Sequence, residues 1–258
     1  LHLAQSGVSV AVLEAGTPGW GASGRNGGFC CLGGSKLSGP ALRRFFGPQA
    51  SETYEASESA AIELVRGLLD THGINADTHS HGETQMAHSP RAARRLAAQA
   101  EQLSKAGETP QFVRRDQLAD HGLNGQFHAA LTTPEGFALN PRKYLFGLAA
   151  AARKAGTALY QRSPARRVEK SGDGFGIDTD RGIMRASQVV ISTNGYSSED
   201  LPSWLAGRYM PAQSTVMVTR PLTDAELQAQ GWFSDQMAYD TRNLLHYFRL
   251  TPDRRFLF

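Results

Sequence analysis

The chain has 258 residues, 40% of them hydrophobic and 20% charged, and a formal net charge of +3. This length accommodates one large domain or two interleaved ones, and the composition is that of an ordinary soluble globular protein. The sequence has no run of 18 or more apolar residues that could span a membrane, and its weak, scattered basic charge favours a solvated surface over a nucleic-acid site.

The N-terminal segment predicts the end of a helix followed by a buried strand. Leu1–Gly7 has the pattern of the last turns of a helix closed by a glycine cap, and Val8–Leu13 is an apolar, β-branched run typical of a fully buried strand in a parallel sheet. A helix that runs directly into such a strand implies an earlier strand and a glycine-rich turn. Because the first residue is Leu and the final RRFLF resembles an unfinished strand, we expect the sequence to be an internal fragment of a longer protein.

Glu14 follows this strand directly, where the carboxyl end of a strand faces the ligand crevice of an α/β sheet. An acidic side chain there binds the ribose hydroxyls of a dinucleotide; the alternative is a surface acid that begins a loop. The following residues are rich in glycine, which lets the backbone approach a ligand closely. Within them, Ser23–Gly28 gathers hydrogen-bond donors, and the guanidinium of Arg25 suits a phosphate or an electron-rich ring edge. The alternative is an irregular loop with exposed charge.

The rest of the chain predicts an α/β fold. Helices are expected at Gln49–Asp70, Pro90–Lys105, Arg114–His121, and from Pro141, capped by Asn140, to near Gly156. Strands are expected at Gly82–Ala87, Gln111–Val113, within Gln126–Leu139, and at Ala158–Gln161, Ala165–Glu169, Phe175–Thr179, Ile183–Arg185, Gln188–Ser192, Thr215–Thr219 and Leu244–Leu250. We predict a Rossmann-like cofactor domain of residues 1–80 and 140–205, interleaved with an α+β substrate domain of residues 81–139 and 206–258.

These segments together resemble a known family. The order is the strand with Glu14, the glycine-rich run Gly19–Gly28, the helix opened by Asn140-Pro141-Arg142, a hairpin with Val168, and the run Ile191–Tyr196. This order is similar to that of the FAD-dependent D-amino-acid-oxidase superfamily, and the form ASGRNGG is closest to its γ-glutamylputrescine oxidoreductase branch. The resemblance covers nearly the whole chain. The N-terminal glycine fingerprint and the C-terminal flavin-binding strand and loop of the family are not in the sequence, consistent with a fragment truncated at both ends.

The resemblance implies FAD as the cofactor and assigns residues to it. Glu14 would hold the adenosine ribose, and Val168 would contact the adenine through its backbone amide and carbonyl; without the resemblance, Val168 is an ordinary strand residue. The residues along the pyrophosphate and isoalloxazine would be Ala22, Ser23, Gly24, Arg25, Asn26 and Gly27. The residues near the pyrophosphate at the end of the second-half strand would be Thr193, Asn194 and Gly195. As the catalytic candidate, Arg25 would lie beneath the flavin, where a fixed positive charge favours the anionic reduced ring.

The cysteine pair and a histidine pair give weaker signals. Cys30 and Cys31 are adjacent and cannot join distant segments, which favours a reducing compartment such as the cytoplasm. We interpret them as buried small residues near the flavin, with a redox pair or a covalent flavin link as alternatives. The pair His79-x-His81 lacks carboxylate or cysteine companions at tight spacing, so we predict no metal site.

The last predicted strand offers candidate substrate contacts. His246 and Phe248 share one of its faces, and Tyr247 and Arg249 share the other. We assign His246 and Phe248 to the substrate cavity, with core packing as the alternative.

The sequence therefore predicts a flavoenzyme that oxidises the C–N bond of an amine or amino acid. The expected substrate resembles γ-glutamylputrescine, the product is an imine, and dioxygen accepts the electrons with release of hydrogen peroxide, which would place the enzyme in putrescine catabolism. A D-amino-acid dehydrogenase that passes electrons to a quinone shares every motif. A nicotinamide-only dehydrogenase would explain Glu14 but not Val168 or Ile191–Tyr196, and an inactive, flavin-free fragment is the non-enzymatic alternative. The sequence does not define the oligomeric state.

Overall fold

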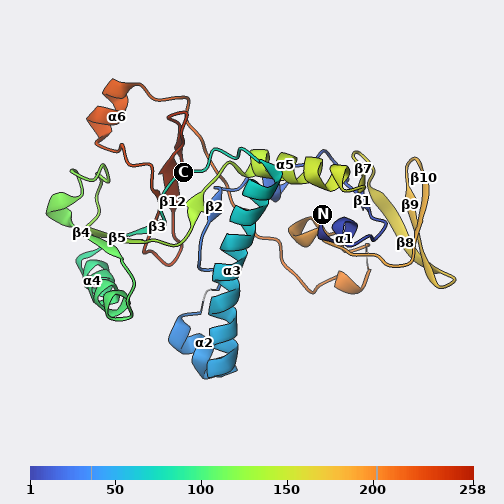
Figure 1. Cartoon of the computed structure of the whole chain (residues 1–258), viewed down its shortest axis with the longest axis horizontal. Helices are drawn as coiled ribbons and strands as arrows, with labels where there is room; N and C mark the ends of the chain where they lie inside the picture. Colours follow the sequence, from blue (N-terminus) through green and yellow to red (C-terminus); the bar gives the residue numbers. More distant parts are fainter. Residues whose placement is uncertain (36, 202) are drawn as a thin grey trace. The chain divides into compact units, whose positions relative to one another are not determined.

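The computed structural model describes residues 1–35, 37–201 and 203–258. The chain divides into two compact units, each built from two stretches of sequence (Figure 1). Unit 1 contains Leu1–Gly24 and Leu145–Thr215, and unit 2 contains Arg25–Tyr144 and Val216–Phe258. Residues 25–80, which the sequence-based division groups with the N-terminal segment, fall in unit 2. The functional division into a cofactor and a substrate domain stays a prediction.

Unit 1 contains a short parallel pair of strands. Helix α1 (His2–Gln5) ends at Gly7, whose φ of 82° and N–H bond to Ala4 form the predicted glycine cap. Strand β1 (Ala11–Leu13) then pairs in parallel with β7 (Ala158–Tyr160). The side chain of Asn140 accepts hydrogen bonds from the N–H groups of Arg142 and Lys143, the second and third residues of α5 (Pro141–Lys154), as predicted, and this helix leads into β7.

Two strand predictions in unit 1 are wrong. The expected buried strand Val8–Leu13 shortens to β1, and Val8 is 50% exposed. Gln188–Ser192 forms no strand, and Val190 is 79% exposed. The physical reason is the same at both places. A β-branched run becomes a buried strand only where neighbouring strands and covering helices receive it. Among the described residues, β7 alone pairs with β1, and no strand pairs with residues 188–192.

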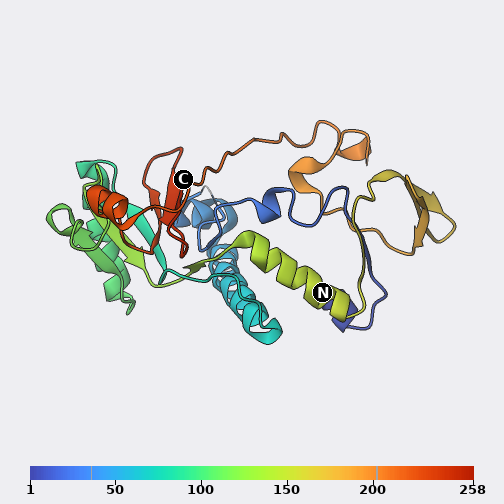
Figure 2. The ribbon, with the colours of Figure 1, turned by 90° about the horizontal axis from the view of Figure 1, so that it is seen from above.

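The remaining elements of unit 1 are an antiparallel sheet and short 3₁₀ turns. Strands β8 (Ala165–Ser171), β9 (Gly174–Thr179) and β10 (Gly182–Ala186) form a meander in the order β10-β9-β8, seen as a curved ribbon in Figure 2. The 3₁₀ turns are η1 (Ala22–Gly24), η3 (Asn194–Tyr196) and η4 (Ser203–Leu205).

Unit 2 is built on a six-stranded sheet with the order β13-β12-β11-β3-β5-β4. Its strands are β3 (Glu83–Met86), β4 (Gln111–Arg114), β5 (Ala129–Thr133), β11 (Met237–Asp240), β12 (Tyr247–Leu250) and β13 (Phe256–Leu257). The pair β11–β3 is parallel, and all other neighbours in this sheet are antiparallel. The strand predicted at Thr215–Thr219 reduces to one bridge, between Val218 and Leu257.

The two faces of this sheet have different neighbours. One face carries the main apolar core, in which Met86, Ala238 and Phe248 pack with Trp232. Helix α6 (Asp224–Gln230) adds Leu227 to this core. On the other face, α4 (Pro90–Lys105) packs through Leu96 against β5. The short 3₁₀ helix η2 (Arg115–Gln117) follows β4, where the sequence predicted a longer helix.

A second part of unit 2 is built around a long helix that packs against a small sheet. Helix α2 (Gly39–Phe46) precedes α3 (Pro48–His72), and α3 packs against a two-stranded sheet of β2 (Phe29–Cys30) and β6 (Phe137–Ala138). The small core between them contains Ile62, Leu69, Ala76, Phe137 and Leu139. Across the described residues, no helix combines the length and apolarity needed to cross a bilayer.

Candidate cofactor site

Glu14 lies directly after β1 and continues the pairing with β7, because its N–H donates to the carbonyl of Tyr160 at 2.9 Å. The side chain is half-buried. Its Oε1 accepts hydrogen bonds from the backbone N–H of Gly16 at 2.8 Å and from Nε1 of Trp20 at 2.7 Å. Within the described part of the chain, Oε2 receives no hydrogen bond. The carboxylate is therefore oriented through one oxygen while the other is available to hydroxyl donors, which fits a ribose.

The glycine-rich run of unit 1 is held by two aromatic side chains that the sequence reasoning missed. The Trp20 ring meets the Tyr196 ring edge-on, with centroids 5.1 Å apart. Gly21 passes beneath Tyr196, where a Cβ atom would lie 3.3 Å from its ring. Trp20 thereby connects the carboxylate of Glu14 to the turn η3. The sequence signal that pointed to Trp20 was the presence of an aromatic residue inside a glycine run.

Thr193, Asn194 and Gly195 belong to this same turn. The Thr193 hydroxyl bonds to the hydroxyl of Ser197 at 2.6 Å, and Asn194 has a φ of 45°. The structure brings these residues to the glycine run through Tyr196, as expected for a shared site. Their contact with a pyrophosphate stays a prediction.

The other unit 1 candidates lie on η1 and β8. Ala22 and Ser23 are exposed, whereas Gly24 is buried. A side chain does not fit at Gly24, since a Cβ atom there would lie 2.3 Å from the carbonyl oxygen of Gly19. Val168 is half-buried on β8, opposite Ile177. Strand β8 is an edge strand of its sheet, so half of its backbone groups face away from β9. The adenine contact of Val168 stays a prediction.

In unit 2 the run continues through two exposed and two buried residues. Arg25 and Asn26 are exposed, and the Asn26 side chain accepts the N–H of Gly28 at 2.8 Å. A Cβ on Gly27 would lie 2.6 Å from the Tyr247 ring, and one on Gly28 would lie 2.0 Å from the carbonyl of Leu139. These two glycines are therefore required by close packing against protein atoms, a role that the sequence reasoning did not give them.

The sheet face opposite the main core carries a buried polar group, formed by Glu83 and Tyr239 next to Cys31. The Tyr239 hydroxyl donates to Oε1 of Glu83 at 3.2 Å. Burial raises the pKa of the Glu83 carboxyl, and burial and this carboxyl raise the pKa of Tyr239 and Cys31. Burial also raises the pKa of Cys30 to about 11. Both cysteines are free, and their thiols are protonated at neutral pH, so they are poor nucleophiles.

Phe248 packs in the main core and is 5% exposed. Its ring lies 5.3 Å from that of Trp232, which favours the core-packing alternative, and a substrate contact by Phe248 stays a prediction. His246 lies just before β12, is exposed, and bonds through Nδ1 to the buried Asp240 carboxylate at 2.9 Å. Burial acts to raise the pKa of Asp240, but hydrogen bonds from His246 and Arg242 outweigh it and lower that pKa. A substrate contact by His246 stays a prediction.

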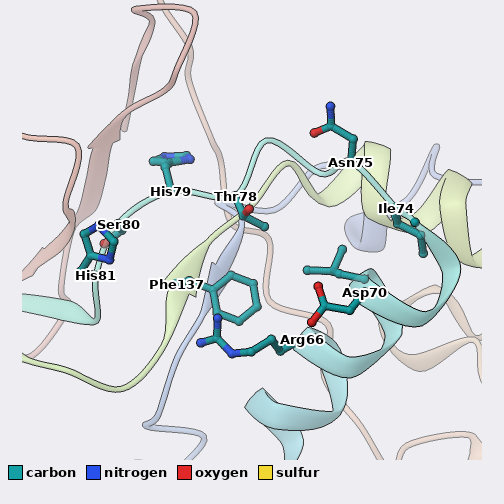
Figure 3. Close-up of a pocket in the computed structure, with 11 residues that line it drawn as sticks. Arg66, Asp70, Ile74, Asn75, Thr78, His79, Ser80, His81 and Phe137 are labelled. Carbon is teal, nitrogen blue, oxygen red and sulfur yellow. The ribbon is translucent and has the colours of Figure 1, made fainter.

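A separate pocket of about 560 Å³ opens in unit 2 beside the end of α3. Figure 3 shows Arg66 and Asp70 on α3, with Phe137, His79 and His81 around the opening. The Arg66 guanidinium lies 4.7 Å from the centroid of the Phe137 ring. The predicted cofactor residues do not line this pocket. No group of three or more potential metal ligands gathers anywhere in the described ranges.

An acidic residue at the end of a parallel strand, followed by a glycine run, is typical of α/β proteins that bind a dinucleotide cofactor. The family model described as FAD dependent oxidoreductase (DAO) matches residues 1–258. The chain belongs to this family, which confirms the resemblance and the α/β fold class.

Individual relatives agree with this assignment. The chain is 28% identical over 261 residues to a probable oxidoreductase OrdL of Rhizobium meliloti (strain 1021), covering 100% of this chain and 59% of the relative. It is 26% identical over 264 residues to the gamma-glutamylputrescine oxidoreductase of Escherichia coli (strain K12), covering 100% and 60%. The chain thus spans about 60% of the length of these relatives.

A solved structure shares the fold. The glycine oxidase of Bacillus cereus ATCC 14579 superimposes with a TM-score of 0.72 at 18% identity, covering 99% of this chain and 65% of that protein.

Proposed function

We propose that the whole protein carrying this chain binds FAD and oxidises the C–N bond of an amine or amino acid. The observation that carries this proposal is the family match along all 258 residues. The geometry at Glu14 supports it, because no described residue bonds to Oε2 at the end of a parallel strand, where an acidic side chain of a dinucleotide-binding fold binds a ribose.

The chain's own residues would hold and orient the cofactor. Glu14 would accept the ribose hydroxyls, and the backbone N–H groups of residues 22–27 would line the pyrophosphate and the flavin ring. Arg25 would place a positive charge beside the ring. When bound, FAD supplies a two-electron acceptor: the substrate carbon gives up a hydride, the nitrogen loses a proton, and an imine forms that water hydrolyses to a carbonyl compound.

The proposed substrate is a γ-glutamylated diamine of the γ-glutamylputrescine type, in keeping with a role in putrescine catabolism. This choice is supported by the ASGRNGG form of the glycine run and by the named Escherichia coli relative. Dioxygen is the proposed final acceptor, which takes two electrons and two protons to become hydrogen peroxide. The two protonated, unpaired cysteines are consistent with the cytoplasm as the proposed location.

Anaerobic mixing of the whole protein with substrate tests the proposal. We expect a yellow protein whose visible absorbance bleaches with γ-glutamylputrescine and recovers in air, with one peroxide formed per recovery. Bleaching without peroxide, and recovery only with a quinone, would replace the oxidase proposal by the dehydrogenase one. A colourless protein that gains no absorbance from added FAD would overturn the flavoenzyme proposal itself.

A further inference from the structure

Arg249 is a cation buried behind the glycine run. It belongs to β12, is 3% exposed, and lies on the face opposite Phe248 and Leu250. Its guanidinium donates in three directions: from Nε to the carbonyl of Gly27 at 2.8 Å, from Nη2 to the carbonyl of Leu139 at 2.9 Å, and from Nη1 to Nε2 of His79 at 2.8 Å. All these residues lie in unit 2.

His79 completes this arrangement as a neutral acceptor. Its Nδ1 lies 2.7 Å from the carbonyl of Asp77, so Nδ1 carries the proton and Nε2 accepts from Arg249. Burial and the charge of Arg249 lower the pKa of His79, against the opposing effect of the Asp77 hydrogen bond, so the ring is neutral at neutral pH. Both ring nitrogens of His79 are therefore occupied by hydrogen bonds.

Arg249 makes no ion pair with any described residue. Asp77 contacts Lys143 at 2.5 Å, and Asp253 contacts Arg255 at 2.7 Å. Burying a cation without a carboxylate partner is costly. Burial lowers the pKa of Arg249 to about 10, yet it stays charged at neutral pH. An apolar side chain would fill this position at lower cost, so the gain must come from the three directed hydrogen bonds.

Those bonds fix the glycine run from one side. Gly27 is held through its carbonyl by Arg249 and is packed against the Tyr247 ring. The next residue, Gly28, accepts the N–H of Leu139 at 2.8 Å, and Leu139 is itself a partner of Arg249. Arg249 is therefore the side chain that fixes the carbonyl of Gly27, beside the packing of this residue against Tyr247.

We propose that Arg249 is a positioning residue that holds Gly27 so that the preceding Arg25 and Asn26 present their groups to FAD. This inference rests on the proposed function. A lysine keeps the charge but cannot reach three acceptors in fixed directions. The geometry of the fork, and not its charge alone, sets the affinity for the cofactor.

The test measures the FAD dissociation constant of the whole protein with Arg249→Lys and Arg249→Met. Leu250→Ala is the matched control, because it removes core packing from the same strand without touching the fork. We expect both Arg249 variants to bind FAD about ten- to a hundredfold more weakly, as for a lost charged hydrogen bond. Leu250→Ala should lower the melting temperature but leave the dissociation constant within about twofold of wild type.

Each result is decisive. Wild-type affinity in Arg249→Lys would show that charge alone suffices and would overturn the positioning role. Equal weakening in Leu250→Ala would show that strand stability, not the fork, controls FAD binding, and would also overturn it. His79→Ala removes one of three acceptors and should give an intermediate affinity; if Arg249→Met unfolds, this variant still tests the fork. A wild-type protein that binds no FAD would instead reject the proposed function.

Discussion

The indole N–H of Trp20 donates to Oε1 of Glu14 at 2.7 Å, six residues back along the chain. The same indole meets Tyr196 edge-on, so one side chain orients the carboxylate and anchors the turn η3. The acid that follows β1 is thus a preoriented acceptor.

Glu14→Ala should weaken FAD binding by the whole protein. Loss of charged hydrogen bonds to the ribose costs about 1.5–3 kcal/mol, which is about a ten- to hundredfold rise in the dissociation constant. Flavin fluorescence during dilution measures it. Glu63→Ala, on the exposed surface of α3, is the control and should bind FAD as wild type does. Unchanged flavin occupancy in Glu14→Ala would count against the ribose role.

Arg25→Ala should slow the chemical step more than it weakens substrate binding. A fixed positive charge that stabilises the reduced flavin contributes about 10²–10³ in rate. Stopped-flow bleaching at saturating substrate separates the two effects, and Arg25→Lys should recover much of the rate. If the alanine variant bleaches at the wild-type rate, Arg25 has a structural or phosphate-binding role instead.

Gly28→Ala should destabilise the protein strongly. A Cβ at this position meets the carbonyl of Leu139 at 2.0 Å, and the φ of 72° is unfavourable for alanine. Overpacking and left-handed strain together cost about 2–5 kcal/mol of unfolding free energy. Gly67→Ala, in the interior of α3 with nothing near its Cβ, should gain about 0.5–1 kcal/mol. Urea denaturation compares the two, and similar midpoints would contradict the packed arrangement of Gly28.

Phe248→Ala should behave as a core mutation. Removing a ring buried among Trp232, Phe256 and Met86 costs about 3–5 kcal/mol of unfolding free energy. Phe45→Ala, at an exposed ring of α2, should change it by less than about 0.5 kcal/mol. Substrate KM should stay unchanged in any Phe248→Leu protein that folds. A raised KM with normal stability would support the substrate assignment of Phe248 over core packing.

Glu83 gives a prediction about pH. Burial raises the pKa of this carboxyl in the folded protein. The folded state therefore holds the proton more tightly than the unfolded state, and stability falls as pH rises from the ordinary glutamate pKa through the raised one. Glu83→Gln should remove this fall, so that the variant gains relative stability between acid and neutral pH. Denaturation midpoints measured across that range check it; parallel curves for the two proteins would show that the carboxyl is not perturbed.

Local signals in the sequence were sufficient for several elements. Helix α4 has the predicted bounds because Ser89 caps it, accepting the N–H of Ala92 at 3.2 Å, and because Pro90 opens it. The cap at Asn140 and the glycine ending α1 were predicted for the same reason.

Features that depend on contacts between distant segments could not be predicted from such local signals. Whether Val190 or Phe248 is exposed or buried depends on which distant segments pack there, and period-two alternation does not choose between the faces of a strand. The site showed the same limit, because Arg249 binds Gly27 across 222 residues of sequence. Glu14 could be found from its position after a strand, but the fork of Arg249 could not.

The parallel pairing of β11 with β3 has a consequence for synthesis of the chain. Tyr239 and Glu83, which meet on these strands, are separated by 156 residues. Strands β3, β4 and β5 leave the ribosome long before β11 does. During that interval β3 is an edge strand, and its backbone N–H and C=O groups on the side of β11 are unpaired. Closing so long a loop is slow, and an open edge invites pairing with other chains. Until β11 has been synthesised, the edge of β3 is therefore without its native partner strand.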